Sequence, residues 1–154
     1  MKIKNLLLVE DNPQDEMLVL RVLRKNNLAN EITVVRDGQQ AVDYLFHEGE
    51  FAHRDAPKLP AIMLLDIGLP RLSGLEVLKR LRADARTHLL PVVIFTSSDE
   101  DRDRLQSYQN GANSFVRKPL AYGEFSETVA SLGVYWLAIN EPPGQQDESD
   151  CSGQ

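Results

Sequence analysis

Acidic, hydroxyl and amine side chains lie at the ends of four short apolar runs in this sequence. Glu10 and Asp11 follow the first run, Asp66 and Thr96 end two others, and Lys118 follows the last. Two carboxylates about 4 Å apart repel by roughly 4 kcal/mol at an effective dielectric constant near 20, so three carboxylates in one crevice need a cation. A small, hard ion with all-oxygen ligands suits this set, and Mg2+ is the expected ion.

The same side chains are suited to phosphoryl transfer. A metal ion can bridge a carboxylate to a phosphoryl oxygen and neutralise the charge that develops during transfer. A carboxylate is also a recognised covalent acceptor, which forms an aspartyl-phosphate. The ammonium of Lys118 can pair with a second phosphoryl oxygen, and the hydroxyl of Thr96 can donate to a third.

The elements that must hold these residues alternate along the chain. Apolar runs predict strands at residues 3–10, 60–66, 91–97 and 114–119, with a weaker strand at 31–37. Helical periodicity predicts helices at 13–26, 38–49, 73–85, 97–112 and 122–140. Continuous apolar runs are typical of parallel strands that are covered on both faces. We therefore expect an α/β fold with a doubly wound five-stranded parallel sheet, whose ligands bind at the carboxyl ends of the strands.

Composition narrows the class of protein. The 154 residues fit one domain, expected over residues 1–140, followed by a disordered tail over 141–154. A net charge of −6 without a basic stripe argues against direct nucleic-acid binding. The first apolar run is too short for a membrane span, and the lone Cys151 agrees with a reducing compartment, so we expect a cytoplasmic protein without membrane contact.

Four segments carry a resemblance to a known family. LLLVEDNP, MLLDIGLPRLSG, VVIFTSS and SFVRKP, in this order and spacing, resemble the receiver domains of two-component response regulators over residues 3 to about 130. The resemblance implies the flavodoxin-like strand order 2-1-3-4-5. It also implies a stand-alone response regulator that accepts a phosphoryl group on Asp66 from a sensor histidine kinase. Such a domain is a signalling module and not an enzyme, apart from its own Mg2+-dependent phosphorylation and dephosphorylation.

The resemblance also implies a role for each site residue. It makes Asp66 the phosphoacceptor and Lys118 the phosphate-pairing lysine. The implied metal ligands are Glu10, Asp11, Asp66 and the backbone carbonyl of Gly68. The bond between Lys118 and Pro119 is expected to be cis, which costs little before proline.

The implied switch is a coupled motion of Thr96 and Phe115 that remodels the face of helix 4, strand 5 and helix 5. Phe115 replaces the family's tyrosine and lacks its hydroxyl, which puts any signal through that group in doubt. Gly68 replaces a larger side chain of many relatives and leaves the phosphoryl group open to water. We therefore predict faster self-dephosphorylation than in a Gly68→Asn variant.

The predicted last helix has more apolar residues than one core stripe needs. The stripe consists of Phe125, Val129, Leu132, Trp136 and Ile139, and the apolar residues off it are Val134, Tyr135, Leu137 and Ala138. An excess apolar face indicates a partner surface, although the stripe could also simply continue into the core. The YWLAINEPP ending, the long 47–60 connection and the LLLVEDNPQD opening resemble single-domain regulators that serve bacteriophytochromes and related kinases. This resemblance implies a phytochrome-type kinase partner and a homodimer through the C-terminal helix face.

Two other functions compete with the switch. A phosphatase of the haloacid-dehalogenase type usually needs a second aspartate two residues after the nucleophile, where this chain has Gly68. A phosphorylation-independent interaction domain would not need the full acidic set. Simple structural roles also stay open: Asp11 could cap a helix, Asp66 could start a turn, and the Thr96 hydroxyl could be satisfied by backbone.

Overall fold

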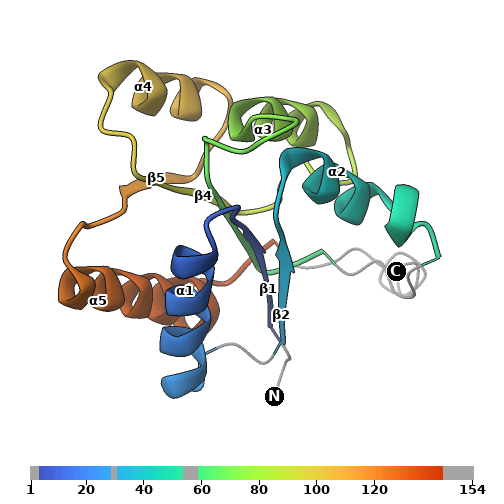
Figure 1. The fold of residues 1–154 in the computed structure, drawn as a ribbon. Helices are drawn as coiled ribbons and strands as arrows, with labels where there is room; N and C mark the ends of the chain where they lie inside the picture. The colour runs from blue at the N-terminus through green and yellow to red at the C-terminus, as the bar shows by residue number, and fades with distance from the viewer. Residues whose placement is uncertain (1–3, 29–30, 54–58, 144–154) are drawn as a thin grey trace.

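The computed structural model describes residues 4–28, 31–53 and 59–143 (Figure 1). Five parallel strands form one sheet in the order β2-β1-β3-β4-β5, as expected. The strands are β1 (Asn5–Val9), β2 (Glu31–Val35), β3 (Ile62–Leu65), β4 (Val92–Thr96) and β5 (Ser114–Arg117). The α-helices are α1 (Pro13–Lys25), α2 (Gly38–Phe46), α3 (Gly74–Ala83), α4 (Asp101–Gln109) and α5 (Tyr122–Gly133).

The sheet divides the hydrophobic core into two layers, because alternate side chains of a strand point to opposite faces. Leu7 and Val9 of β1 pack with residues of α2 and α3, whereas Leu6 and Leu8 pack with residues of α1 and α5. Figure 1 shows α1 beside α5 on one face and α2 beside α3 on the other. Each fully buried leucine contributes roughly 1.5–3 kcal/mol. Burial on both faces therefore accounts for the continuous apolar runs.

The first helix begins at a cap that leaves the acidic pair available. The side chain of Asn12 accepts hydrogen bonds from the backbone N–H groups of Gln14 and Asp15, at 2.9 and 3.1 Å. Pro13 occupies the first turn, where its missing N–H has no cost. Asn12 therefore caps α1, and Asp11 does not have the simple capping role.

The fourth helix is shorter than the predicted span of 97–112. The backbone N–H of Ser98 donates to the Thr96 hydroxyl, and that of Glu100 donates to the Ser98 hydroxyl. Such local bonds compete with helical hydrogen bonding, so residues 97–100 form a loop and α4 begins at Asp101.

The C-terminal helix changes its geometry at Gly133. A π-helical segment, η2 (Val134–Ile139), continues α5, and Asn140 donates from its backbone N–H to the carbonyl of Tyr135. The wider turn rotates later side chains relative to an α-helix. Leu137 is consequently buried and Ile139 is 62% exposed, so the predicted stripe was wrong for these two residues.

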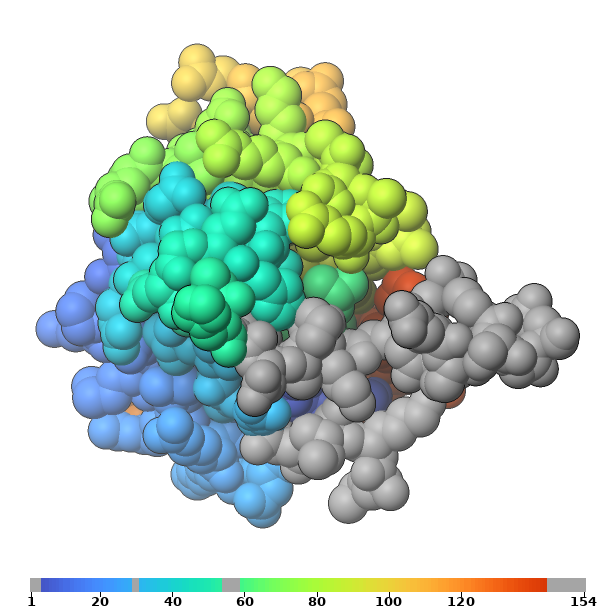
Figure 2. Space-filling view, turned by 90° about the vertical axis from the view of Figure 1, so that its right-hand side faces the viewer, coloured from blue at the N-terminus to red at the C-terminus, as the bar shows by residue number. Residues whose placement is uncertain are grey.

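The connection between α2 and β3 contains a short 3-10 helix, η1 (Gly49–Phe51). The ring of Phe51 packs edge-on against Tyr44 of α2, with 5.3 Å between ring centroids. Figure 2 shows the surface of α2 and η1 next to that of α3. Most of the predicted disordered tail, residues 144–154, lies outside the described residues. No helix among the described residues has the length and apolar character needed to cross a membrane.

Candidate functional site

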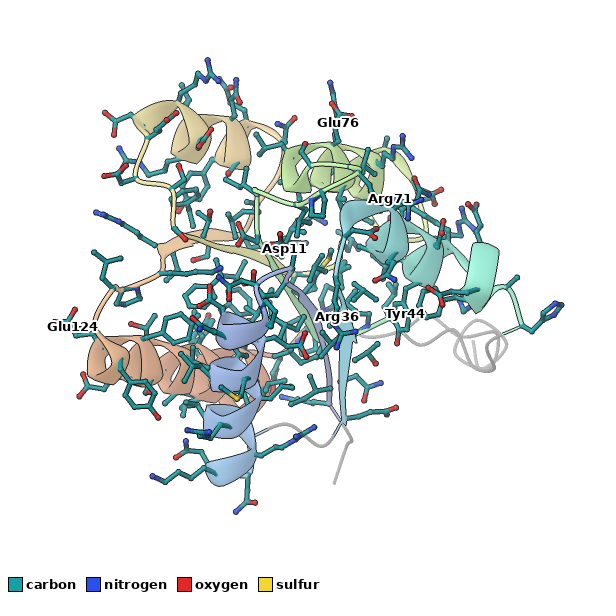
Figure 3. All side chains as sticks on the ribbon, viewed as in Figure 1. Asp11, Arg36, Tyr44, Arg71, Glu76 and Glu124 are labelled. Atoms are coloured by element: carbon teal, nitrogen blue, oxygen red, sulfur yellow. The ribbon has the colours of Figure 1, made fainter. Side chains whose placement is uncertain are left out.

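The carboxyl ends of four strands bring the predicted site residues together. Glu10 follows β1, Asp66 follows β3, Thr96 ends β4, and Lys118 follows β5. The backbone N–H of Lys118 donates to the Thr96 carbonyl at 2.7 Å, which continues the ladder between β4 and β5 to the site. A pocket of about 800 Å³ opens here, and its lining includes Asp11, Asp66, Thr96 and Lys118. Asp11 lies on the loop between β1 and α1 (Figure 3).

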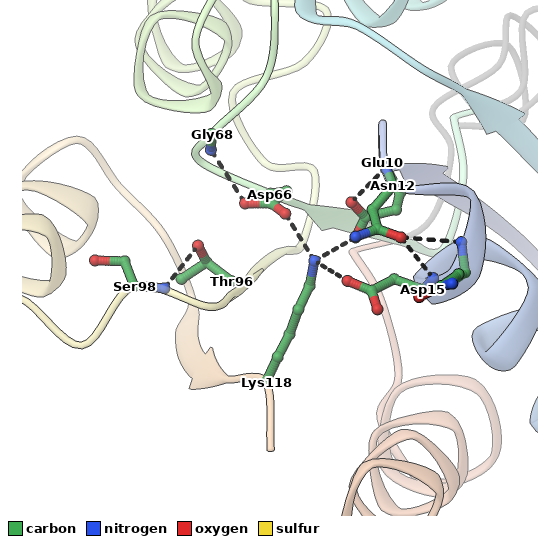
Figure 4. A network of polar contacts seen from close by, with 9 residues as sticks. Glu10, Asn12, Asp15, Asp66, Gly68, Thr96, Ser98 and Lys118 are labelled. Atoms are coloured by element: carbon green, nitrogen blue, oxygen red, sulfur yellow. Dashed lines mark hydrogen bonds and ion pairs between the residues drawn. The ribbon is translucent and has the colours of Figure 1, made fainter. Parts of the chain in front are cut away.

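The ammonium of Lys118 is the centre of the polar network (Figure 4). Its Nζ lies 2.6 Å from Glu10 Oε1, 2.7 Å from Asp66 Oδ2 and 2.8 Å from Asp15 Oδ2. The Lys118 side chain is only 5% exposed, and those of Glu10 and Asp66 are also buried. These ion pairs are therefore shielded from water. Charges in the protein interior interact more strongly than charges at the surface.

Burial changes the acid–base behaviour of two of these groups. It raises the pKa of Glu10 to about 7, against the opposing effect of the Lys118 ammonium. Burial also acts to lower the pKa of Lys118, but hydrogen bonds to Asp15 and Asp66 outweigh it, and that pKa is raised. Three carboxyl groups contact this one ammonium and Asp11 adds a fourth to the site, so in their ionised form they carry more negative charge than one lysine can offset.

The excess charge fits a divalent cation. One carboxylate oxygen from each of Glu10, Asp11 and Asp66 can be chosen so that all three lie within 4.8 Å of one another. Carboxylate oxygens are the ligands that hard divalent ions prefer. The backbone N–H of Gly68 donates to Asp66 Oδ1 at 3.1 Å. Asp66 therefore also starts a local turn, which is the structural role that the sequence left open for it.

The hydroxyl of Thr96 is buried and connected to α4. It accepts the backbone N–H of Ser98 at 3.3 Å, and the hydroxyl of Ser98 donates to Asp103 of α4 at 2.6 Å. Phe115 is partly buried and packs against the core layer that contains α2 and α3. Thr96 and Phe115 lie on the neighbouring strands β4 and β5, a position that suits the expected switch.

The described residues contain no cis peptide bond, so the bond between Lys118 and Pro119 is trans. The expectation of a cis bond was therefore wrong. The two isomers differ by only about 0.5–1 kcal/mol before proline, so sequence cannot decide between them. The trans backbone already brings the Lys118 ammonium to three carboxylates.

Sequence reasoning missed Asp15 and the link between Ser98 and Asp103. Asp15 comes four residues after Asp11 and lies in the first turn of the predicted helix. This spacing could have placed its carboxylate near the acidic pair. Its contact with Lys118 spans 103 positions and has no local signal. Ser98 and Asp103 were assigned to one continuous helix, which concealed the loop between them.

Comparisons with known proteins agree with this arrangement. Residues 6–130 match the response regulator receiver domain family. The chain is 39% identical over 140 residues to FilR2 of Methanothrix harundinacea, described as a probable methanogenesis regulatory protein, with 90% of this chain and 87% of FilR2 covered. It is 32% identical over 134 residues to the response regulator Rcp1 of Synechocystis sp., with 87% of this chain and 89% of Rcp1 covered.

Solved structures extend the likeness to three dimensions. The Mn(2+)-bound form of Rcp1 matches with a TM-score of 0.85 and 31% identity, over 92% of this chain and 99% of that one. The bacteriophytochrome response regulator RtBRR matches with a TM-score of 0.72 and 45% identity, over 92% of this chain and 85% of that one. The flavodoxin-like receiver fold is thereby confirmed, and the bound metal of Rcp1 agrees with the acidic cluster found here.

Proposed function

This chain belongs to the response regulator receiver domain family, and from that membership we propose that Asp66 is its phosphoacceptor. Receiver domains are signalling domains of two-component systems and take a phosphoryl group from a histidine kinase. The observation that carries the assignment is the 2.7 Å contact between Lys118 Nζ and Asp66 Oδ2 inside the pocket. The contact puts a positive charge beside the carboxylate that would receive the phosphoryl group.

The proposed transfer uses this geometry. A carboxylate oxygen of Asp66 attacks the phosphorus of a phosphohistidine, a P–O bond forms, and the P–N bond breaks. The bonding electrons return to the imidazole nitrogen of the donor, which takes a proton from water. Lys118 pairs with an oxygen of the transferred group, and Thr96 donates its hydroxyl to another oxygen.

We assign the metal as Mg2+ and its protein ligands as Glu10, Asp11, Asp66 and the backbone carbonyl of Gly68. The clustered carboxylate oxygens support a cation at this point. When bound, Mg2+ supplies positive charge that neutralises phosphoryl oxygens during transfer. Its preference for carboxylate and carbonyl oxygen suits this ligand set.

The first experiment measures intact mass after incubation with Mg2+ and acetyl phosphate. We expect one phosphoryl group on the wild type, and none on Asp66→Asn or after addition of EDTA. Asp101→Asn removes an exposed carboxylate of α4 and serves as the matched control, which should be phosphorylated like the wild type. An adduct on Asp66→Asn, or none on the wild type with any donor, would contradict the assignment.

Gly68 is part of the same proposal. A side-chain Cβ at this position would lie 3.9 Å from Asp66 Oδ1, with no other contact within 4 Å among the described residues, so the approach to Asp66 is open. An asparagine there would partly cover the phosphoryl group and slow its hydrolysis. The decay of phosphorylated wild type and Gly68→Asn should therefore differ, and equal rates would reject this role.

The output is proposed to pass through Thr96 and Phe115 to the face formed by α4, β5 and α5. A groove of about 650 Å³ lies between β5 and α5, lined in part by Val116, Leu132 and Trp136. Tyr135 of η2 also lines this groove, and Tyr135 and its neighbour Val134 are more than 40% exposed. Burial of such a surface in a homodimer would stabilise the dimer by the hydrophobic effect.

Sedimentation equilibrium tests the homodimer. Ile139→Asp puts a charge on the exposed apolar side of η2 and should weaken self-association. Leu89, in the connection between α3 and β4, is 65% exposed, compared with 62% for Ile139. Leu89→Asp is therefore the control and should leave self-association unchanged. A monomeric wild type, or equal effects of the two changes, would reject the dimer face.

We propose a phytochrome-type histidine kinase as the partner, because RtBRR, 45% identical, is described as a bacteriophytochrome response regulator. Phosphotransfer from purified kinases of several sensor classes tests this choice, and faster transfer from another class would overturn it. The stand-alone organisation and the cytoplasmic location expected from the sequence remain predictions.

A further inference from the structure

Asp15 is a carboxylate of the site that the assigned roles do not use. It lies in the first turn of α1, and its Oδ2 accepts a hydrogen bond from Lys118 Nζ at 2.8 Å. Its side chain is 21% exposed, so it forms the outer wall of the ion-pair cluster. We propose that Asp15 is a positioning residue that holds the Lys118 ammonium and so keeps the metal-binding oxygens available. This inference rests on the proposed function, because it assigns a partner to the phosphate-pairing lysine.

Lys118 and a divalent ion compete for the same oxygen atoms. Lys118 contacts Glu10 and Asp66, which also belong to the carboxylate cluster suited to a divalent ion. The ammonium and a metal ion would therefore draw on the same two carboxylates. Among the partners of Lys118, Asp15 is the one outside that cluster. Its contact can persist when a metal ion occupies the other two.

Both ends of the contact are held by the backbone. The N–H of Asp15 donates to the Asn12 cap, and the N–H of Lys118 donates to the carbonyl of Thr96. The ion pair therefore links the start of α1 to the end of β5 (Figure 4). Without the Asp15 charge, the ammonium would have only Glu10 and Asp66 as partners and would bind them more tightly. The metal ion would then have to displace it from both.

The next residue provides a matched control. Glu16 carries the same charge in the same turn of α1, but it pairs with Arg36, with two contacts of 3.0 Å. Asp15→Asn and Glu16→Gln therefore remove equal charge from adjacent positions. Only Asp15→Asn removes a partner of Lys118.

The test uses metal affinity and the Lys118 ammonium signal, neither of which needs phosphorylation. Calorimetric titration with Mg2+ should show binding about fivefold weaker in Asp15→Asn, which corresponds to ~1 kcal/mol, and unchanged in Glu16→Gln. Asp15→Glu should restore part of the affinity. The 15N–1H NMR signal of the Lys118 ammonium should shift in Asp15→Asn and stay in place in Glu16→Gln.

A double-mutant cycle separates positioning from the mere loss of a negative charge. If Asp15 acts through Lys118, Asp15→Asn should leave Mg2+ affinity unchanged in a Lys118→Met background. A fivefold loss that persists there, or an equal loss in Glu16→Gln, would overturn the proposal. Failure of Asp66 to accept a phosphoryl group would reject the proposed function but leave this cycle measurable.

Discussion

Lys118 is a buried cation and Arg82 a partly buried one, and opposite kinds of partner hold them. Lys118 contacts three carboxylates, whereas Arg82 donates to neutral oxygens only. The Arg82 acceptors are the carbonyls of Gly111, Thr87 and His88 and the side-chain oxygen of Asn113. Burial lowers the pKa of Arg82, while the pKa of Lys118 is raised because its carboxylates outweigh burial.

The difference separates a structural cation from a functional one. The rigid guanidinium of Arg82 joins the end of α3 to the turn between α4 and β5 through neutral oxygens, which carry no net negative charge to attract a second cation. The carboxylates around Lys118 exceed its charge, so they repel one another until another cation arrives. The hydrogen bonds of Arg82 therefore stabilise the folded protein. The carboxylates around Lys118 destabilise the metal-free protein but provide a site for a cation.

The largest effect expected from this comparison is on stability at Arg82. Arg82→Met removes four hydrogen bonds and should lower the free energy of unfolding by about 2–3 kcal/mol, measured by urea denaturation. The loss should be the same at pH 5 and pH 8, and Mg2+ affinity should not change. Arg80→Met, at an exposed position of α3, is the control and should lie within about 0.5 kcal/mol of wild type. A change in metal affinity in Arg82→Met would remove the distinction between the two clusters.

A smaller effect of opposite sign is expected at Glu10. Its folded-state pKa of about 7 exceeds the ordinary value of 4.5, so the folded state binds more protons between these pH values. Wild-type stability without metal should therefore fall as pH rises from 5 to 8. Glu10→Gln should be more stable than wild type by about 1–2 kcal/mol at pH 8 in EDTA, and the gain should vanish near pH 5. A gain that does not depend on pH would show that the buried charge is not its cause.

The smallest effect expected is the dependence of metal binding on pH. A metal ion needs Glu10 ionised, so protons compete with it below about pH 7. Mg2+ affinity should fall by no more than about tenfold between pH 7 and pH 6, as a single protonation allows. Titration of wild type by calorimetry at both pH values measures the change. An affinity that is constant over this range would indicate that Glu10 does not ligate the ion.

Local chemistry was sufficient to predict most of the fold and the inner site. The apolar runs predicted the parallel strands, because a strand covered on both faces must be apolar throughout. The order of elements then brought Glu10, Asp66, Thr96 and Lys118 to the carboxyl edge of one sheet. Those residues could be found from sequence because each directly follows or ends a recognisable strand.

Only the tertiary structure decided the outer partner of Lys118 and the end of the last helix. Asp15 meets Lys118 because α1 and the end of β5 adjoin in space, a relation that no local pattern encodes. Gly133 allows α5 to pack closely, since a Cβ there would lie 2.7 Å from a methyl group of Leu23. The π-helical segment that follows buries Leu137 and exposes Ile139, because its wider turn rotates side chains away from their α-helical positions and Leu137 packs into the core layer that contains α1 and α5.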